Sequence, residues 1–315
     1  MQYRRFLANN IRYLFSITLF AWHSVFSLPT LTQEPPTVGN FSLENSQQPG
    51  PFFSFGQNIV DKNQVLLSVN PSYSSSQSQK IFEYTPSLLY GLSDKASVML
   101  TLPIALEYTN NNQNFSGIGD LGLDLEYAFY HQDTKQYSDE ATIIFAPSFP
   151  TSNLDQLSKR TDPSNRVSGF SRKNAPSSFD TISYFAGATY SRTAINWYGF
   201  ISPGILLFNK HSGIQQGIQY FYNAGIGHIF SSQSSRYIFS GLLEFNGQMS
   251  EKTSYNKLTV PNTGGNIIYI TPSVWFSTKA IVVQVGVSLP IQQSWYGNQS
   301  NLSYFTGGII TWTFQ

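Results

Sequence analysis

The sequence contains no cysteine and very little charge. Lys, Arg, Asp and Glu make up 11% of its 315 residues, less than half of the roughly 25% usual in soluble domains. The formal net charge is +1, so the sequence predicts no nucleic-acid partner, which would need a basic surface. The absence of cysteine excludes disulfides and thiolate metal sites.

Long apolar runs are also missing, because no stretch after residue 27 approaches 18 apolar side chains. The sequence therefore predicts no membrane helix. It is instead rich in Ser, with 42 residues, and in aromatic residues, with 25 Phe and 19 Tyr. Abundant aromatic residues argue against disorder, and Ser, Phe and Tyr are poor helix formers. This composition favours an all-β protein.

From about residue 63 the hydrophobic pattern has period two. In residues 280–292, for example, Ile281, Val283 and Val285 share one face, and several intervening side chains are small or polar. Such runs are long for globular strands, but they suit a tilted strand that crosses a bilayer in roughly 9–11 residues. Twelve segments of this kind are predicted, at residues 63–74, 79–91, 96–108, 117–130, 140–150, 178–190, 196–208, 218–230, 236–250, 265–277, 280–292 and 302–314.

The connections between these segments alternate in length. Short turns include residues 92–95, 191–195 and 231–235, whereas the long loops cover 109–116, 151–177, 209–217, 251–264 and 293–301. An even strand number with alternating loop lengths is typical of an antiparallel transmembrane β-barrel in the bacterial outer membrane, with its short turns in the periplasm. We therefore predict a barrel of about 12 strands over residues 63–315.

Aromatic side chains near the strand ends predict two girdles at the membrane interfaces. The periplasmic girdle would contain Tyr90, Tyr127, Phe129, Trp197, Tyr237, Trp275, Trp312 and Phe314. The outer girdle would contain Tyr84, Tyr108, Phe208, Tyr220, Tyr222, Tyr269, Trp295 and Tyr304.

The residues before the barrel have two predicted roles. Residues 1–27 have the pattern of a secretory signal peptide, in which Arg4 and Arg5 precede an apolar stretch and Val25–Ser27 offers a cleavage site. Residues 28–62 contain five prolines and are predicted to form an irregular periplasmic arm, which could reach into the barrel lumen.

Several segments resemble the MetA-pathway of phenol degradation family. They are Tyr90–Asp94 followed by Val98–Ile104, Gly117–Leu123, and Thr271–Ser273 leading into Val285–Pro290. The resemblance covers residues 63–315 and implies an outer-membrane transporter loosely linked to aromatic compounds. The chain departs from the family at Ser152, where many relatives have Gly. Its terminal aromatic residue, Phe314, comes one position early in the signal for the barrel-assembly machinery, its expected folding partner.

Two groups of charged residues are candidate functional sites. If the apolar faces contact lipid, six carboxylates point into the lumen: Glu83, Glu107, Asp120, Asp124, Glu126 and Glu244. They either belong to an ordinary solvated lumen or attract cations as a selectivity element. The loop 151–177 contains five basic residues, Lys159, Arg160, Arg166, Arg172 and Lys173. They either bind lipopolysaccharide phosphates or are simply solvated. Membrane lipids are expected to surround the barrel itself.

No motif predicts catalysis, a metal site or a cofactor. Residues 117–122 match G-x-G-x-x-G, but an alternating strand follows them where a dinucleotide site needs a helix. We interpret the protein as a channel or uptake porin for small solutes, including aromatic or hydrophobic ones, and not as an enzyme. The alternatives are a surface-exposed structural or adhesive barrel and a lipid hydrolase. The lipid hydrolase hypothesis is weakened because His228 is the one histidine in a predicted strand and lies near its periplasmic end, away from the outer leaflet where such an enzyme would act.

The loop lengths predict the orientation of the barrel. An epitope tag within 151–177 or 251–264 should be labelled by antibody on intact cells, because long loops face outward. A tag at residues 231–235 should be labelled only after the outer membrane is permeabilised. Surface labelling at 231–235 would contradict the orientation.

Overall fold

The computed structural model describes residues 47–76, 79–110, 113–152, 181–231 and 237–314. The chain divides into Met1–Gln33 and Glu34–Gln315, and every described residue belongs to the second unit. The predicted signal peptide lies outside the described residues. So does the basic group of Lys159, Arg160, Arg166, Arg172 and Lys173.

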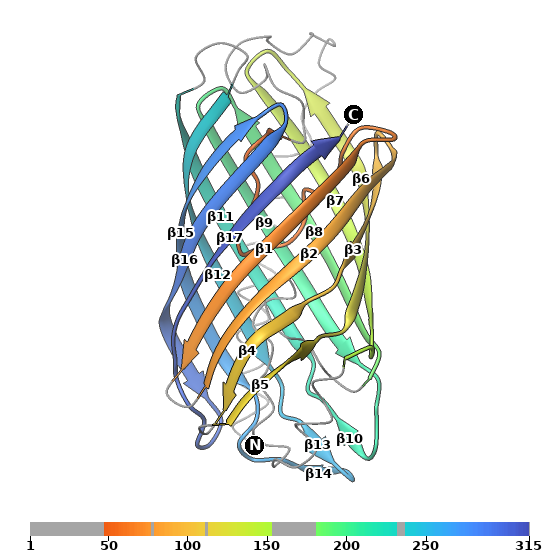
Figure 1. Cartoon of the computed structure of the whole chain (residues 1–315), viewed down its shortest axis with the longest axis vertical. Helices are drawn as coiled ribbons and strands as arrows, with labels where there is room; N and C mark the ends of the chain where they lie inside the picture. The colour runs from red at the N-terminus through yellow and green to blue at the C-terminus, as the bar shows by residue number, and fades with distance from the viewer. Residues whose placement is uncertain (1–46, 77–78, 111–112, 153–180, 232–236, 315) are drawn as a thin grey trace, which may run out of the picture. The chain divides into compact units, whose positions relative to one another are not determined.

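The described strands form a closed antiparallel barrel of 12 strands (Figure 1), as predicted from the sequence. The first strand, β1, pairs with both β2 and β17, which closes the wall. The wall consists of β1 (Val65–Ser76), β2 (Gln79–Ser93), β3 (Ala96–Thr101) continued by β4 (Ile104–Asn110), β5 (Gln113–Ile118) continued by β6 (Leu121–Asp133), β7 (Tyr137–Phe149), β8 (Ser183–Ala194), β9 (Trp197–Phe208), β11 (Gln219–Ser231), β12 (Tyr237–Ser250), β15 (Gly265–Thr278), β16 (Ile281–Trp295) and β17 (Leu302–Phe314). Within the described ranges, no helix is long and apolar enough to cross a membrane.

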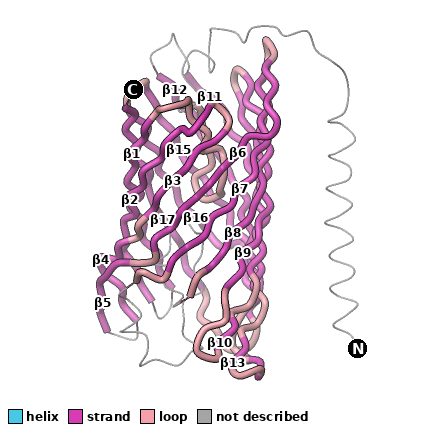
Figure 2. The backbone as a smooth tube through the Cα atoms, turned by 90° about the vertical axis from the view of Figure 1, so that its right-hand side faces the viewer, coloured by secondary structure: helices cyan, strands magenta, loops and turns pink. Residues whose placement is uncertain are grey.

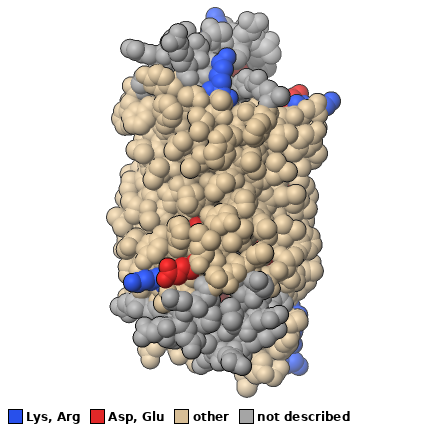
Figure 3. Space-filling model, in the orientation of Figure 1, with Lys and Arg blue, Asp and Glu red and all other residues tan. Residues whose placement is uncertain are grey.

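The outer surface of the wall is apolar. Along β15, Val274 and Phe276 are exposed, whereas the alternate residues Ser273 and Trp275 are buried toward the lumen. Figure 3 shows one face of the barrel, where Lys, Arg, Asp and Glu are almost absent between the two ends. An apolar band around a closed barrel satisfies the two demands of a bilayer, since neither unpaired backbone groups nor charges are left facing hydrocarbon.

Two loops that the sequence analysis treated as irregular contain short strands. β10 (Ile214–Gln215) pairs with β13 (Ser254–Tyr255), which pairs in turn with β14 (Leu258–Thr259). Figure 2 shows β10 and β13 beyond one end of the barrel. Strands of two residues carry too little periodicity to be predicted from sequence, and this sheet exists only because two distant loops meet.

A β-bulge in β4 moves Glu107 out of the lumen. Glu83 pairs with Ala105, but the next residue of β2, Phe82, pairs with Glu107, so Leu106 is an extra residue. Glu107 therefore shares the outward face with Phe82 and is exposed. The prediction that Glu107 faces the lumen is wrong, because a bulge shifts the alternation by one residue.

The predicted girdles are only partly correct. At the short-turn end, Tyr127, Trp197 and Trp312 are exposed on the outer surface, but Trp275 is buried on the inward face. At the other end, Phe208 and Tyr269 are buried. Position at a strand end predicts the height of an aromatic residue in the membrane, but not the face of the wall that it occupies.

The register predicts that neighbouring positions of β3 respond differently to arginine. Leu100 is 43% exposed on the apolar outer surface, whereas Thr101 faces the lumen. An arginine on the lipid face costs about 2–4 kcal/mol at the bilayer midplane and less toward the interfaces, so Leu100→Arg should destabilise the barrel by about 2 kcal/mol. Thr101→Arg should cost clearly less. Urea unfolding of both variants in lipid vesicles measures the difference, and equal losses would contradict the register.

Candidate functional site

Residues 47–62 of the N-terminal arm lie inside the barrel lumen, where Figure 1 shows them as an orange-red trace. Gln47 Nε2 donates to the backbone oxygen of Lys279 at 3.4 Å, in the turn between β15 and β16. Lys62 N donates to Asp94 Oδ1 at 3.1 Å, in the turn between β2 and β3. Both ends of this segment therefore lie at the short-turn end of the barrel, and the segment forms a loop that enters and leaves on the same side.

The deepest anchor of the arm is the carboxylate of Glu244 on β12. It accepts the backbone N–H groups of three successive residues, from Phe52, from Phe53 at 3.2 Å and from Ser54 at 3.1 Å. The hydroxyl of Ser54 also donates to it, at 3.0 Å. Glu244 has no exposed surface. A buried carboxylate is tolerated only with such a shell of donors, and charge-assisted bonds of this kind are stronger than neutral ones.

A second carboxylate, Glu126 on β6, holds the arm at Gln57 and Asn58. Its two oxygens accept the backbone N–H groups of Gln57 at 2.7 Å and Asn58 at 3.1 Å. The chain turns here through positive φ angles of 92° at Gly56 and 63° at Gln57. A Cβ atom at position 56 would lie 2.2 Å from Thr189 Oγ1, so this position requires glycine. The turn aims consecutive amides at one anion, as in other backbone nests.

Aromatic side chains of the arm pack into space that strand glycines leave free. The ring of Phe55 lies 4.6 Å from the ring of Phe185 between centroids. A Cβ atom at either Gly187 or Gly204 would come within 2.7 Å of the Phe55 ring. Phe52 lies in the same way against Gly286, at 2.8 Å. These glycines let the arm approach the wall closely, and a methyl group at any of them would have to displace the arm or its aromatic neighbours.

Of the other predicted lumen residues, Glu83 is completely buried on the inward face of β2, where Thr85 Oγ1 donates to it at 3.2 Å. Asp120 is buried between β5 and β6 and accepts the backbone N–H of Ser152 at 3.2 Å. Asp124 lines the lumen cavity. The six carboxylates are thus not one cluster: two hold the arm, three lie elsewhere within the barrel wall, and Glu107 lies outside.

A cavity of about 300 Å³ remains between the arm and the wall. Aromatic rings, hydroxyls and amides line it, and its ionisable lining residues are Asp124, His131, Asp133 and Glu140. His131 Nε2 lies 2.8 Å from Asp133 Oδ2, and His131 Nδ1 lies 3.8 Å from Glu140 Oε2. No Lys or Arg belongs to this lining among the described residues.

His131 and Asp133 were missed because the predicted strands end at residue 130 and resume at 140, and Glu140, the first residue of the second strand, was not assigned a face. In the structure, β6 extends to Asp133 and β7 begins at Tyr137, so the connection between them has three residues. Extending the inward alternation of Ile144 and Thr142 back along β7 would have found Glu140. It would not have found His131 and Asp133, because a bulge near Ala128 and Tyr130 shifts the register of β6 just before them.

Within the described ranges, no group of three or more His, Asp or Glu side chains is placed to hold a metal ion. His228, the histidine considered for a lipid hydrolase, is exposed on β11, and its ring lies 5.3 Å from that of Phe230. A hydrolytic role would require a hydrogen-bonded serine and an orienting third group. The described contacts of His228 include neither.

No family model matches the chain, and no curated protein matches it in sequence. In structure it is similar to the COG4313 outer membrane channel from Pseudomonas putida F1, with a TM-score of 0.60 and 13% identity over 85% of this chain and 99% of that one. The chain has the fold of a bacterial outer-membrane barrel. Two further similar structures are porins. The NanC porin has a TM-score of 0.46 and 12% identity over 79% of this chain and 100% of that one. The KdgM porin has a TM-score of 0.41 and 9% identity over 79% of this chain and 99% of that one.

The carboxylate of Glu244 is predicted to immobilise the arm. Glu244→Gln would turn an amide N–H₂ group toward backbone donors and remove the charge from each of these hydrogen bonds. A spin label on Gly50→Cys can report the effect, because no cysteine competes and a side chain at Gly50 meets nothing within 4 Å. We expect the label to be more mobile in Glu244→Gln than in the parent protein, because the backbone that carries it is no longer held. The control is Glu251→Gln, which alters an exposed carboxylate of the outer loop. Equal mobility in all three proteins would contradict the anchoring role.

Proposed function

We propose that the protein is a passive channel of the bacterial outer membrane that admits small solutes, including aromatic and hydrophobic ones. The observation that carries this proposal is the cavity between the arm and the wall. Residues 47–62 occupy part of the lumen, and the cavity is the space that they leave free. Its volume of about 300 Å³ is at the lower end of known ligand cavities.

The lining of the cavity supports an aromatic or hydrophobic solute. Phe53, Phe55, Phe221 and Trp275 contribute rings, and neighbouring Ser, Thr, Asn and Gln side chains contribute neutral hydrogen-bonding groups. Aromatic walls with a few polar groups are the usual composition of sites for small organic molecules. The similarity in fold to the COG4313 outer membrane channel supports a channel, and the resemblance to the MetA-pathway of phenol degradation family is in keeping with an aromatic solute.

The charges in the cavity favour cations over anions. Asp124, Asp133 and Glu140 line it without Lys or Arg in the described lining, and His131 lies between two of these carboxylates. Carboxylates in a narrow passage with low-dielectric walls attract cations and repel anions. Glu126 and Glu244 contribute less, because their charge is already compensated by the amides of the arm.

The proposal predicts charge-selective transport of aromatic probes. Purified protein in planar bilayers should pass phenyltrimethylammonium more readily than benzenesulfonate, two permanently charged solutes with the same ring. The variant Asp124→Asn/Asp133→Asn/Glu140→Gln should move the reversal potential toward zero, most strongly at low salt, because screening shortens to roughly 3 Å at 1 M.

Glu107→Gln is the matched control, since it removes a carboxylate from the outward face of the same barrel. It should leave the reversal potential unchanged. A barrel that is folded but passes neither probe nor small ions would contradict the channel function and favour an adhesive or structural barrel. A selectivity that responds equally to Glu107→Gln would contradict the assignment of the lining.

A further inference from the structure

A charged cluster lies on the outer surface of β7 and β8, near the short-turn end. Asp139 of β7 pairs directly with Arg192 of β8. Their chain neighbours Ser138, Glu140 and Ser191 line the lumen cavity. Because successive residues of a strand face opposite sides, Asp139 and Arg192 point outward, toward the membrane side of the wall.

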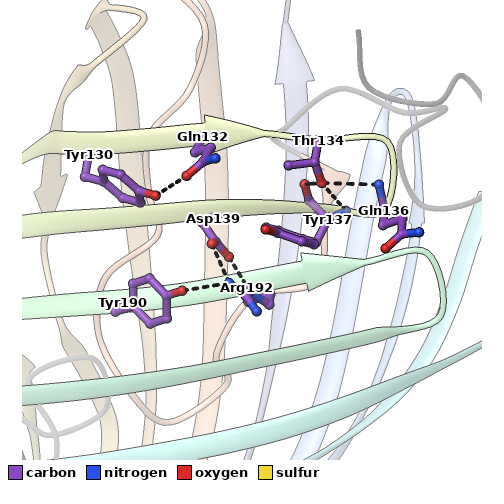
Figure 4. A network of polar contacts seen from close by, with 8 residues as sticks. All are labelled: Tyr130, Gln132, Thr134, Gln136, Tyr137, Asp139, Tyr190 and Arg192. Atoms are coloured by element: carbon purple, nitrogen blue, oxygen red, sulfur yellow. Dashed lines mark hydrogen bonds and ion pairs between the residues drawn. The ribbon is translucent and has the colours of Figure 1, made fainter. Parts of the chain in front are cut away.

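The guanidinium of Arg192 is held in one orientation (Figure 4). Its Nε donates to Asp139 Oδ1 at 2.6 Å, and its Nη2 donates to Asp139 Oδ2 at 2.7 Å. Nη2 also lies 3.4 Å from the hydroxyl oxygen of Tyr190, and the guanidinium carbon is 4.2 Å from the ring centroid of Tyr137. This two-point pairing leaves Nη1, with two N–H donors, unbonded to any described residue.

The two partners differ sharply in exposure. The Asp139 side chain is 5% exposed and both of its oxygens are occupied, whereas the Arg192 side chain is 38% exposed. The carboxylate is thus inside the cluster and the free edge of the guanidinium is at the surface. What the cluster offers to an external ligand is a fixed pair of cationic donors, supported on aromatic rings.

The position of the cluster matches the headgroup level of the periplasmic leaflet. Arg192 lies two residues before the end of β8, and Trp197, exposed at the start of β9, belongs to the same end. Deeper along β7, Ile143 and Phe145 are 50% and 48% exposed and belong to the apolar band. A polar donor site is therefore followed directly by a surface that suits acyl chains.

We propose that this cluster binds the phosphate of a glycerophospholipid from the periplasmic leaflet. The free Nη1 N–H groups would donate charge-assisted hydrogen bonds to phosphate oxygens, and the acyl chains would lie along Ile143 and Phe145. A soluble anion would gain only the donors, because Asp139 already compensates most of the charge. A lipid gains the apolar contact as well, and this favours a lipid as the occupant.

Native mass spectrometry of the full chain in detergent tests the proposal with two probes that share their acyl chains. Dioleoylphosphatidylethanolamine carries the phosphate and dioleoylglycerol lacks it. The parent protein should retain the phospholipid preferentially, and Arg192→Gln should lower that preference about tenfold, which corresponds to losing charge-assisted hydrogen bonds. Lys135→Gln, which removes a neighbouring exposed lysine from the β6–β7 turn, should leave it unchanged.

Arg192→Gln leaves a buried carboxylate without its partner, so folding needs a separate check. The double variant Asp139→Asn/Arg192→Gln removes both charges while keeping similar side-chain volume. It should recover the heat-modifiable folded form and still lack the phospholipid preference. If the folded double variant retains phospholipid like the parent, the pair is only structural and the proposal is overturned. Displacement of the lipid by millimolar inorganic phosphate would also overturn it, because the site would then be a general anion site.

Discussion

The structure depends on the pairing of buried carboxylates with the backbone amides of the arm. An irregular segment inside a barrel has no ladder partner for its N–H groups, and a carboxylate on an inward strand face has little water around it. Glu244 and Glu126 satisfy both deficits at once, because each accepts amides from consecutive arm residues. Without these contacts, neither the position of the arm nor the cavity beside it would be defined.

The packing of the aromatic rings of the arm against strand glycines complements this electrostatic pairing. Phe52 and Phe55 require the absence of side chains at Gly286, Gly187 and Gly204, where a single carbon atom would meet their rings. The barrel wall is therefore shaped to the arm as much as the arm is to the wall. The remaining space is a cavity of defined size, and its lining comes from both partners.

The β7 strand shows how one stretch of chain serves two environments. Glu140 faces the cavity, and the adjacent Asp139 faces outward, where it holds Arg192. Each carboxylate is compatible with its surroundings for a different reason. Glu140 lies near His131 and the cavity, whereas Asp139 is covered by a guanidinium at the membrane boundary, where an unpaired charge would be costly.

The sequence by itself determined the all-β class, the antiparallel barrel and most strand limits, because period-two alternation is a local property of the chain and long exported strands have few other solutions. It failed where the alternation breaks. The bulge at Leu106 placed Glu107 outside, and the polar residues 132–139 concealed the ends of β6 and β7.

Only the tertiary structure decided what the inward carboxylates do. Glu126 meets its amides 69 and 68 residues away, and Glu244 meets those of Phe53 and Ser54 across 191 and 190 residues. The sequence pattern of a carboxylate on an inward face is the same whether water, a solute or a backbone amide lies opposite it. No local pattern encodes that choice, because the partner is brought to it by closure of the barrel around the arm.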